Sequence, residues 1–377
     1  MTWEIAILFL SSLFCLYYAF FILSARKGLL RIEITPISSH SPSVSVLIAA
    51  RNEQETIAHC LNAVLDQDYP RDRMEVILID DGSTDTSAAI ANNIAAHDGR
   101  LRVLLMTASG GNKSSRKPAA LAAGMKHAKG EIILTTDADC TVSSNWISSM
   151  IRSFDDETVF VAGPVKEIPT TSLISKLSQM EFLGIIGVSA GLIADDTPII
   201  CNGANIAFRR DSFVAANGFG ESAGFCDDEV LMHRIKSRGL GKIRYSIEEG
   251  SIVVTHAPST FLAFWNQRIR WASKRGHYED KTILLKLVAL YIFFFLLLIL
   301  LIVSPFKPSL LPFAIVLFGI KAAVDYTVLH AAARIFGLQL KALHFVLAQL
   351  LHVPYIVAAA FAGQFSSLEW KGQRIRG

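Results

Sequence analysis

The chain begins with an apolar run that contains no charged side chain, Ile5–Ala25. A helix rises 1.5 Å per residue, so a run of this length covers a hydrocarbon core of about 30 Å. A cleavable signal carries its positive charge before the apolar part, whereas here Arg26, Lys27 and Arg31 follow it. We therefore predict an uncleaved transmembrane anchor over residues 1–27, with the N-terminus outside and the chain after it in the cytoplasm.

Further apolar segments occupy the end of the chain, and we assign residues 281–370 to transmembrane or interfacial helices. The segments are Leu287–Val303, Leu310–Ala332 and Leu343–Phe365. The middle one contains Lys321 and Asp325, which are four residues apart and can pair on one helical face. If all three spanned, the basic tail at 369–377 would lie outside, against the positive-inside rule. Either the charged segment lies at the interface or the rule fails here.

The composition agrees with a membrane protein that has a water-facing domain. Hydrophobic residues make up 51%, charged residues 18%, and the mean hydropathy is +0.40. A net charge of +3 produces no strong field, so we expect no nucleic acid partner. The five cysteines are scattered without a C-x-x-C pair, which indicates reduced thiols rather than disulfides or a zinc site.

Between the apolar regions, residues 40–280 alternate between strand-like and helix-like patterns. Continuous apolar runs, typical of strands buried on both faces, occur in "SVSVLIAA", "MEVILID", "RLRVLLM" and "EIILTTD". Helical spacing separates them, as in "QETIAHCLNAVLDQ" and "KPAALAAGMKHA". This alternation predicts an α/β domain with a parallel, doubly wound sheet, in which ligands bind beyond the carboxyl ends of the strands.

Acidic residues follow three of these predicted strands. They are Glu53 after the first, Asp80 and Asp81 after the second, and Asp137 and Asp139 after the fourth. Carboxylates gathered at one sheet edge repel each other unless a partner neutralises them. Two carboxylates two residues apart can share one Mg²⁺ or Mn²⁺ ion, which usually takes its other ligands from phosphate and water. We also expect Ser83 or Thr84 to cap the helix that follows the second strand.

Several short motifs occur in one order from Val44 to Lys274. They are "AARNEQETI", "VILIDDGSTDTS", "KPAALAAGM", "TTDADC", "CNGANIAFRRDSF", "CDDEVLMHRIKSRG" and "QRIRW". This series resembles membrane-bound family-2 glycosyltransferases of the Q-x-x-R-W type, similar to poly-N-acetylglucosamine synthases and ceramide glucosyltransferase-like enzymes. The resemblance implies a GT-A fold, Rossmann-like with a mostly parallel sheet and flanking helices, between N- and C-terminal transmembrane helices.

The same resemblance implies the activity. We expect an inverting glycosyltransferase that moves a sugar from a nucleotide-sugar, UDP-linked, to a membrane lipid or a growing cell-envelope glycan. The enzyme would lie in the plasma membrane (the inner membrane of a bacterium), with its catalytic domain in the cytoplasm. A processive polysaccharide synthase is one alternative. A non-catalytic membrane protein that binds nucleotide-sugar or lipid is another.

The resemblance also assigns the donor side of the site. Nucleotide contacts are implied for Glu53, Asp80 or Asp81, Lys117 and Asp137. Asp139, with Asp137 assisting, would hold the divalent ion, Mg²⁺ or Mn²⁺. The family's usual "KAGALNAG" is here "KPAALAAG", so Ala122 stands where the family has a polar asparagine.

A candidate general base lies at the start of a predicted helix of about three turns, which runs from Asp227 to a closing glycine. A carboxylate at a helix N-terminus is stabilised as the anion and can accept a proton. Asp228 matches the family's base; Asp227 is placed to cap the helix or contact the diphosphate, and Glu229 is the neighbouring competitor. Asn205 is implied to contact a sugar hydroxyl.

The stretch "TFLAFWNQRIRWASKR" precedes the C-terminal apolar region. Gln267, Arg270 and Trp271 fall on one face of a helix, where tryptophan can stack on an acceptor sugar and arginine can meet the diphosphate. The aromatic residues before them suit the membrane interface. The apolar but charge-interrupted segment Ser172–Ile193 is either an interfacial helix near the acceptor or a buried helix.

Overall fold

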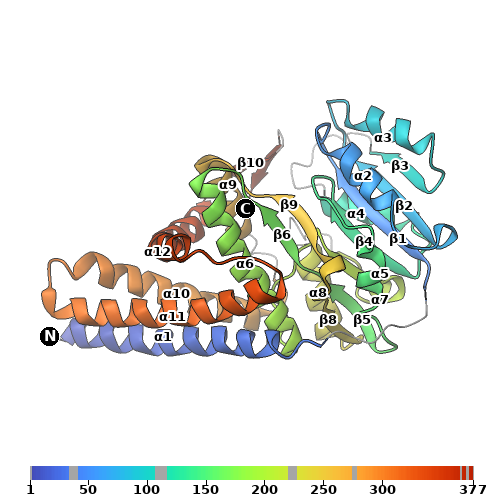
Figure 1. Ribbon diagram of the computed structural model, residues 1–377. Helices are drawn as coiled ribbons and strands as arrows, with labels where there is room; N and C mark the ends of the chain where they lie inside the picture. Colours follow the sequence, from blue (N-terminus) through green and yellow to red (C-terminus); the bar gives the residue numbers. More distant parts are fainter. Residues whose placement is uncertain are drawn as a thin grey trace.

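The computed structural model describes residues 2–33, 41–106, 117–219, 227–273, 278–365, 367–370 and 373–376 (Figure 1). The helices are α1 Thr2–Leu29, α2 Ile57–Leu65, α3 Ser87–Ala95, α4 Lys117–Met125, α5 Trp146–Ile151, α6 Leu173–Ala194, α7 Arg210–Ala215, α8 Asp227–Ser237, α9 Phe261–Ala272, α10 Lys281–Val303, α11 Leu311–Ile335 and α12 Ala342–Phe365. The strands are β1 Val44–Ala50, β2 Met74–Asp80, β3 Leu101–Leu105, β4 Ile132–Asp137, β5 Thr158–Ala162, β6 Val165–Ile168, β7 Ile206–Arg209, β8 Lys242–Tyr245, β9 Val253–His256, β10 Ser367–Trp370 and β11 Gln373–Arg376.

The central sheet has seven strands in the order β3-β2-β1-β4-β7-β5-β8. Strands β1 to β4 pair in parallel, while β7 runs antiparallel between β4 and β5. The side chains of Val46, Leu47 and Ile48 in β1 are fully buried, as the unbroken apolar run predicted. Helices α3 and α4 pack against β1 to β3. The predicted α/β fold with a mostly parallel sheet is therefore confirmed.

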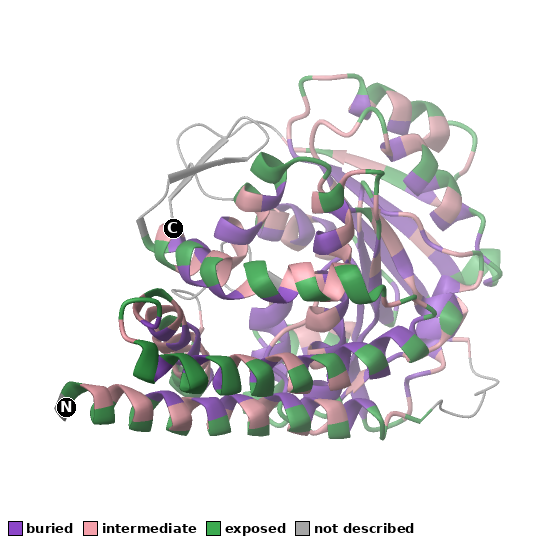
Figure 2. Ribbon diagram, turned by 60° about the vertical axis from the view of Figure 1, so that its left-hand side comes forward, coloured by how far each residue is buried: buried purple, intermediate pink, exposed green. Residues whose placement is uncertain are grey.

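Within the described part of the chain, α1, α6, α10, α11 and α12 are long and apolar enough to cross a membrane. Helix α1 contacts α6, α10 and α11, and Figure 1 shows α1, α10 and α11 side by side, extending away from the sheet. At the end far from the sheet, Lys307 forms an ion pair with Glu4. Exposed residues line the outer surfaces of these helices (Figure 2), among them the large apolar side chains Phe9, Phe20 and Ile315, as expected where lipid surrounds a bundle.

Helix α6 is the segment whose position the sequence left open between an interfacial and a buried helix. It crosses α1 with their backbones in close contact, because both helices have glycine at the crossing. A Cβ atom at Gly28 would lie 2.0 Å from the carbonyl oxygen of Gly191, and one at Gly191 would lie 1.8 Å from that of Ala25. Small residues that let two backbones approach are typical of helix pairs in membranes. Helix α6 is therefore a mostly buried helix that joins the sheet domain to the apolar bundle.

Helix α12 runs in a different direction from α1, α10 and α11 (Figure 1). Phe336, the residue that ends α11, packs against Tyr245 of β8, with ring centroids 6.5 Å apart. Near the end of α12, Gly363 lies against Ala272 of α9. The end of α11 therefore lies beside the sheet, and the end of α12 lies beside α9. The sequence left open whether the charged segment, now α11, lies at the interface; in the structure α11 packs against α1 and α6 in the bundle.

Candidate active site

The carboxyl ends of three parallel strands meet at one edge of the sheet. In the register of β1 with its neighbours, Ala50 pairs with Asp80 of β2, and Ala49 pairs with Asp137 of β4. A pocket of about 230 Å³ opens beyond this edge. The predicted site residues that line it are Glu53, Asp81, Lys117, Asp137, Asp139, Asp228, Gln267, Arg270 and Trp271. The structure thus brings together residues from β1, β2, β4, α4, α8 and α9.

The loops after β1 and β2 are tied to each other beside this pocket. Asn52, whose φ is 52°, accepts a hydrogen bond from the Thr84 backbone at 2.8 Å, and its own N–H donates to Ser83 Oγ at 2.9 Å. Neither Ser83 nor Thr84 caps α3, contrary to our expectation. Instead, Asp85 Oδ1 accepts from the Ser87 backbone at 2.9 Å. The hydroxyl residues hold the two strand-end loops in register, and a carboxylate near the start of α3 does the capping.

The two adjacent acids after β2 face different directions. Asp81 lines the pocket, while Asp80 turns back into its own loop, where its Oδ2 accepts a hydrogen bond from the Ser83 backbone at 3.0 Å. Glu53 also lines the pocket, and its carboxylate accepts from Thr56 Oγ1 at 3.3 Å. Of the pair that the resemblance left open, Asp81 is the one placed to contact a ligand, and we drop Asp80 from the candidate site.

Charges of both signs surround the turn after β4. Lys117 Nζ lies 2.5 Å from Asp137 Oδ1. Asp139 is open to the pocket, and the partial desolvation there, together with the Asp137 carboxylate, raises its pKa. Desolvation lowers the pKa of Arg270, and the two aspartates act in the opposite direction, so this guanidinium stays a cation facing them.

This arrangement suits a cation that is shared with a ligand. The described residues contain no group of three or more side chains that could hold a metal ion by themselves. Asp137 and Asp139 provide two carboxylates on one turn, and the pocket leaves room for other oxygen ligands. Mg²⁺ and Mn²⁺ are commonly held by one or two protein carboxylates, with phosphate oxygens and water completing the shell. The residues present therefore fit such an ion when a diphosphate is bound.

Asp228 is held with one carboxylate oxygen fixed and the other unused. Its Oδ2 accepts a hydrogen bond from the Gly203 backbone at 2.6 Å. Its Oδ1 is buried and has no hydrogen-bond partner in the described part of the chain. Glu229, the competitor, accepts a hydrogen bond from the Tyr278 hydroxyl at 2.9 Å and does not line the pocket. The side chain of Asp227 lies outside the described residues.

The sugar contact that we expected of Asn205 is not supported by its position. Its side chain is fully buried, with Oδ1 accepting from Trp146 Nε1 at 3.0 Å. The amide nitrogen donates to the carbonyls of Pro164 and Ser251 at 2.8 and 2.7 Å. These bonds satisfy the amide within the core, so Asn205 stabilises the loops behind the site. Asn202, from the same motif, lines the pocket instead.

Helix α9 separates this pocket from a second, apolar cavity. Gln267, Arg270 and Trp271 line the candidate active-site pocket, in agreement with their shared helical face. The aromatic residues before them line the apolar cavity; these are Phe261, Phe264 and Trp265. The final residues of the predicted stretch, Lys274 and Arg275, lie outside the described residues.

The sequence profile described as Glycosyl transferase family 2 matches residues 45–215, which include nearly all of β1 to β7 and the three acidic strand ends. These residues are a glycosyl transferase family 2 domain. A solved structure with a similar fold is the mannosyltransferase PcManGT from Pyrobaculum calidifontis, in complex with GDP-Man and Mn²⁺, at 20% identity and a TM-score of 0.63. The match covers 96% of this chain and 98% of that one, and it confirms the GT-A fold with its apolar helices.

The curated relatives are glycosyltransferases and synthases. The probable glycosyltransferase YdaM of Bacillus subtilis is 27% identical over 254 residues, which cover 66% of this chain and 58% of YdaM. The beta-monoglucosyldiacylglycerol synthase of Nostoc is 29% identical over 257 residues, which cover 64% of this chain and 50% of the synthase. The poly-beta-1,6-N-acetyl-D-glucosamine synthase of Staphylococcus aureus is 27% identical over 237 residues, which cover 62% of this chain and 54% of the synthase. The chain spans about half the length of the curated relatives it matches.

A buried chain of polar side chains that links α6 to α9 was not predicted. Arg268 Nε donates to Glu181 Oε2 at 2.8 Å, and its Nη2 donates to Ser178 Oγ at 3.2 Å. Ser178 Oγ in turn donates at 3.0 Å to Glu167, which lines the candidate active-site pocket. Burial raises the pKa of Glu167 to about 7. Glu181 is the one glutamate in the apolar segment 172–193, and a buried carboxylate needs a cationic partner, so the sequence held a signal for this ion pair. Nothing in the local sequence marked Glu167.

Proposed function

We propose that this protein is a membrane-bound inverting glycosyltransferase, which moves a sugar from a nucleotide-sugar to a lipid or glycan acceptor at the membrane surface. The observation that carries the proposal is the unused oxygen of Asp228. Asp228 lines the same pocket as the acidic sheet edge, and α9, which also lines that pocket, contacts the apolar helices α6 and α12. The family-2 domain and its glycosyltransferase relatives support the reaction class.

For the donor, Glu53 and Asp81 are placed to accept hydrogen bonds from the base and ribose of the nucleotide. Lys117 and Arg270 supply positive charge where a diphosphate would lie. We propose a UDP-sugar on the basis of the sequence resemblance, with GDP-mannose as the alternative that the P. calidifontis enzyme suggests.

Asp137 and Asp139 would hold the divalent ion, Mg²⁺ or Mn²⁺. When bound, such an ion neutralises charge that develops on the departing diphosphate. The Mn²⁺ in the P. calidifontis complex supports a divalent ion without deciding which one this protein uses.

The transfer itself needs a base for the acceptor hydroxyl. Asp228 takes that proton through its unused oxygen, while the Gly203 N–H holds the other oxygen in place. The acceptor oxygen bonds to the anomeric carbon as the bond from that carbon to the diphosphate breaks, which inverts the anomeric centre. Trp271, on the α9 side of the pocket, offers a ring on which an acceptor sugar or head group can rest.

The orientation in the membrane forms part of the proposal. Arg26 and Lys27 lie at the end of α1 nearest the domain, and the positive-inside rule places that end in the cytoplasm. Helices α1, α10 and α11 would then span, with α12 returning to the cytoplasmic side. A processive polysaccharide synthase remains the alternative function, which the S. aureus relative favours.

The test is release of nucleoside diphosphate by the purified protein in native lipid, with a panel of UDP-sugars and GDP-mannose, with and without Mn²⁺. We expect one donor to be consumed in a metal-dependent reaction and its sugar to appear on lipid or polysaccharide by mass spectrometry. If no donor is consumed, and calorimetry detects no nucleotide binding, the proposal is wrong. Binding without turnover under every condition would instead favour the non-catalytic alternative.

A further inference from the structure

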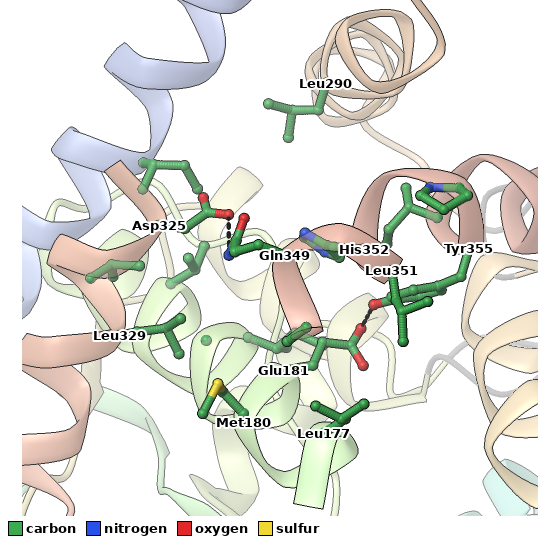
Figure 3. Close-up of a pocket in the computed structure, with 18 of the residues that line it drawn as sticks. Leu177, Met180, Glu181, Leu290, Asp325, Leu329, Gln349, Leu351, His352 and Tyr355 are labelled. Carbon is green, nitrogen blue, oxygen red and sulfur yellow. Dashed lines mark hydrogen bonds between the residues drawn. The ribbon is translucent and has the colours of Figure 1, made fainter. Parts of the chain in front are cut away.

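A cavity of about 720 Å³ lies between α1, α6, α9, α10, α11 and α12. It is distinct from the catalytic pocket, and most of its lining side chains are apolar. Figure 3 shows Met180 and Leu177 of α6, Leu329 of α11 and Leu351 of α12 around it. Because the surrounding helices are of membrane-spanning length, the ligand that can enter from the side is lipid.

The polar side chains in the cavity wall are already engaged with one another. Tyr355 donates a hydrogen bond to Glu181, and Gln349 Nε2 donates to Asp325 Oδ2 at 3.1 Å (Figure 3). Behind this wall, Lys321 Nζ lies 2.8 Å from the same Asp325 oxygen. The described lining residues include two carboxylates and neither lysine nor arginine. Each carboxylate is paired with a buried cation, Asp325 with Lys321 and Glu181 with Arg268, so its charge is compensated and an uncharged hydrocarbon chain fits the apolar lining.

The cavity and the catalytic pocket are separated by about one layer of side chains. The guanidinium of Arg268 lies 4.4 Å from the ring centre of Phe264 and 4.3 Å from that of Trp271. Phe264 lines the cavity and Trp271 lines the catalytic pocket. On α6, the consecutive residues Glu181 and Phe182 face the cavity and the pocket respectively. A molecule bound in one chamber thus lies close to a molecule bound in the other.

We propose that this cavity holds a hydrocarbon chain of the acceptor, and that the acceptor is a neutral lipid alcohol of the diacylglycerol class; this rests on the function proposed above. The proposed base selects a neutral alcohol over a phosphate-bearing lipid. A base such as Asp228 takes a proton from a hydroxyl, whereas a phosphate is already ionised at neutral pH and needs no base. The lipid hydroxyl gives its proton to Asp228 and bonds to the anomeric carbon, and the nucleoside diphosphate leaves.

The cavity contributes orientation rather than affinity. A bilayer is as apolar as the cavity, so moving a chain from one to the other gains little free energy. A chain held between α6 and α12 instead directs its head group past α9 into the catalytic pocket, which favours the reactive geometry.

The experiment is photo-crosslinking of the full-length protein in phosphatidylcholine nanodiscs with a diacylglycerol that carries a diazirine in one chain. We expect peptides from α6 and α12, including Met180 and Leu351, to be labelled. Unlabelled diacylglycerol should compete better than equal mole fractions of phosphatidylglycerol or polyprenyl phosphate. Equal competition by all three lipids would show bulk lipid in the cavity, and stronger competition by polyprenyl phosphate would identify an anionic lipid; either result overturns the proposal.

Cavity-filling variants test the link to transfer. Ala348→Trp and Ala358→Trp place an indole among the lining residues of α12. Leu350→Trp is the matched control, since this side chain is 57% exposed and outside the lining. We expect the filled variants to lose labelling and to raise the KM for diacylglycerol about tenfold or more, with donor Kd and donor hydrolysis by water unchanged. An equal KM in filled and control variants would contradict the proposal.

The two proposals fail in different ways. If a donor is consumed with another acceptor but never with diacylglycerol, the cavity proposal is wrong and the glycosyltransferase function stands. If no donor is bound or consumed, the function is wrong, and competition in the crosslinking experiment still decides whether the cavity selects neutral lipid.

Discussion

Asp228→Asn tests the proposed base with little change in shape. The asparagine carbonyl can still accept the 2.6 Å hydrogen bond from the Gly203 N–H, and the new amide nitrogen then takes the position of the oxygen that had no partner. The hydrogen bond from Gly203 then goes to a neutral amide oxygen instead of a carboxylate oxygen and becomes weaker. We therefore expect the free energy of unfolding to change by about 1 kcal/mol. The amide cannot accept a proton, and loss of a general base lowers a rate by about 10²–10⁴-fold.

In free energy, that loss corresponds to a barrier higher by about 3–5 kcal/mol. The assay is single-turnover release of nucleoside diphosphate at saturating acceptor, paired with calorimetry of donor binding. The control is Glu229→Gln, which alters the neighbouring carboxylate that Tyr278 contacts. We expect full donor affinity in both variants and lost transfer in Asp228→Asn alone. Turnover within about threefold of wild type, with normal donor binding, would refute the role of Asp228.

Three other predictions follow from the geometry. Gly203→Ala would place a Cβ 3.2 Å from Asp228 Oδ2, so we expect kcat to fall about tenfold with donor Kd unchanged, in the same assay. Burial raises the pKa of Glu167 from 4.5 to about 7, so between these pH values the folded state holds a proton that the unfolded state has lost. The free energy of unfolding therefore falls as pH rises through that window. Glu167→Gln should remove this fall, measured as the change in Tm from pH 5 to 7.5, and an unchanged fall in the variant would contradict the assignment. In intact cells, an impermeant maleimide should label Ser309→Cys and spare Gln339→Cys, and the reverse pattern would invert the proposed topology.

Much of the donor side of the site was predictable because it depends on local pattern. The apolar runs that became β1, β2 and β4 are interior strands, whereas the remaining run, β3, lies at the sheet edge and is only partly buried. Parallel strands bring their carboxyl ends to one edge. Asp81 and Asp137 could therefore be placed together from their positions after such runs. The face shared by Gln267, Arg270 and Trp271 follows from helical spacing alone, and all three line the pocket. The choice of Asp228 came from the resemblance.

The partners of polar side chains were decided by the tertiary structure. Asn205 looked like a loop residue free to bind sugar, but the packing of three distant segments surrounds its amide. Arg268 meets Glu181 only because α9 and α6 pack together, across 87 positions of sequence. Hydropathy likewise marked α12 as long enough to span a membrane, but only the structure shows that its end at Gly363 lies against α9.

Local sequence pattern was enough to predict strands β1 to β4, the apolar segments long enough for a membrane, and the acids that follow the strands. These properties depend on neighbours within a few residues, since burial imposes a period on the chain. The three-dimensional packing was needed to show which oxygen of Asp228 is unused, where α12 runs, and that an apolar cavity adjoins the candidate active-site pocket. Those features depend on contacts between residues far apart in the chain, and the periodic pattern of apolar residues within one segment carries no information about such contacts.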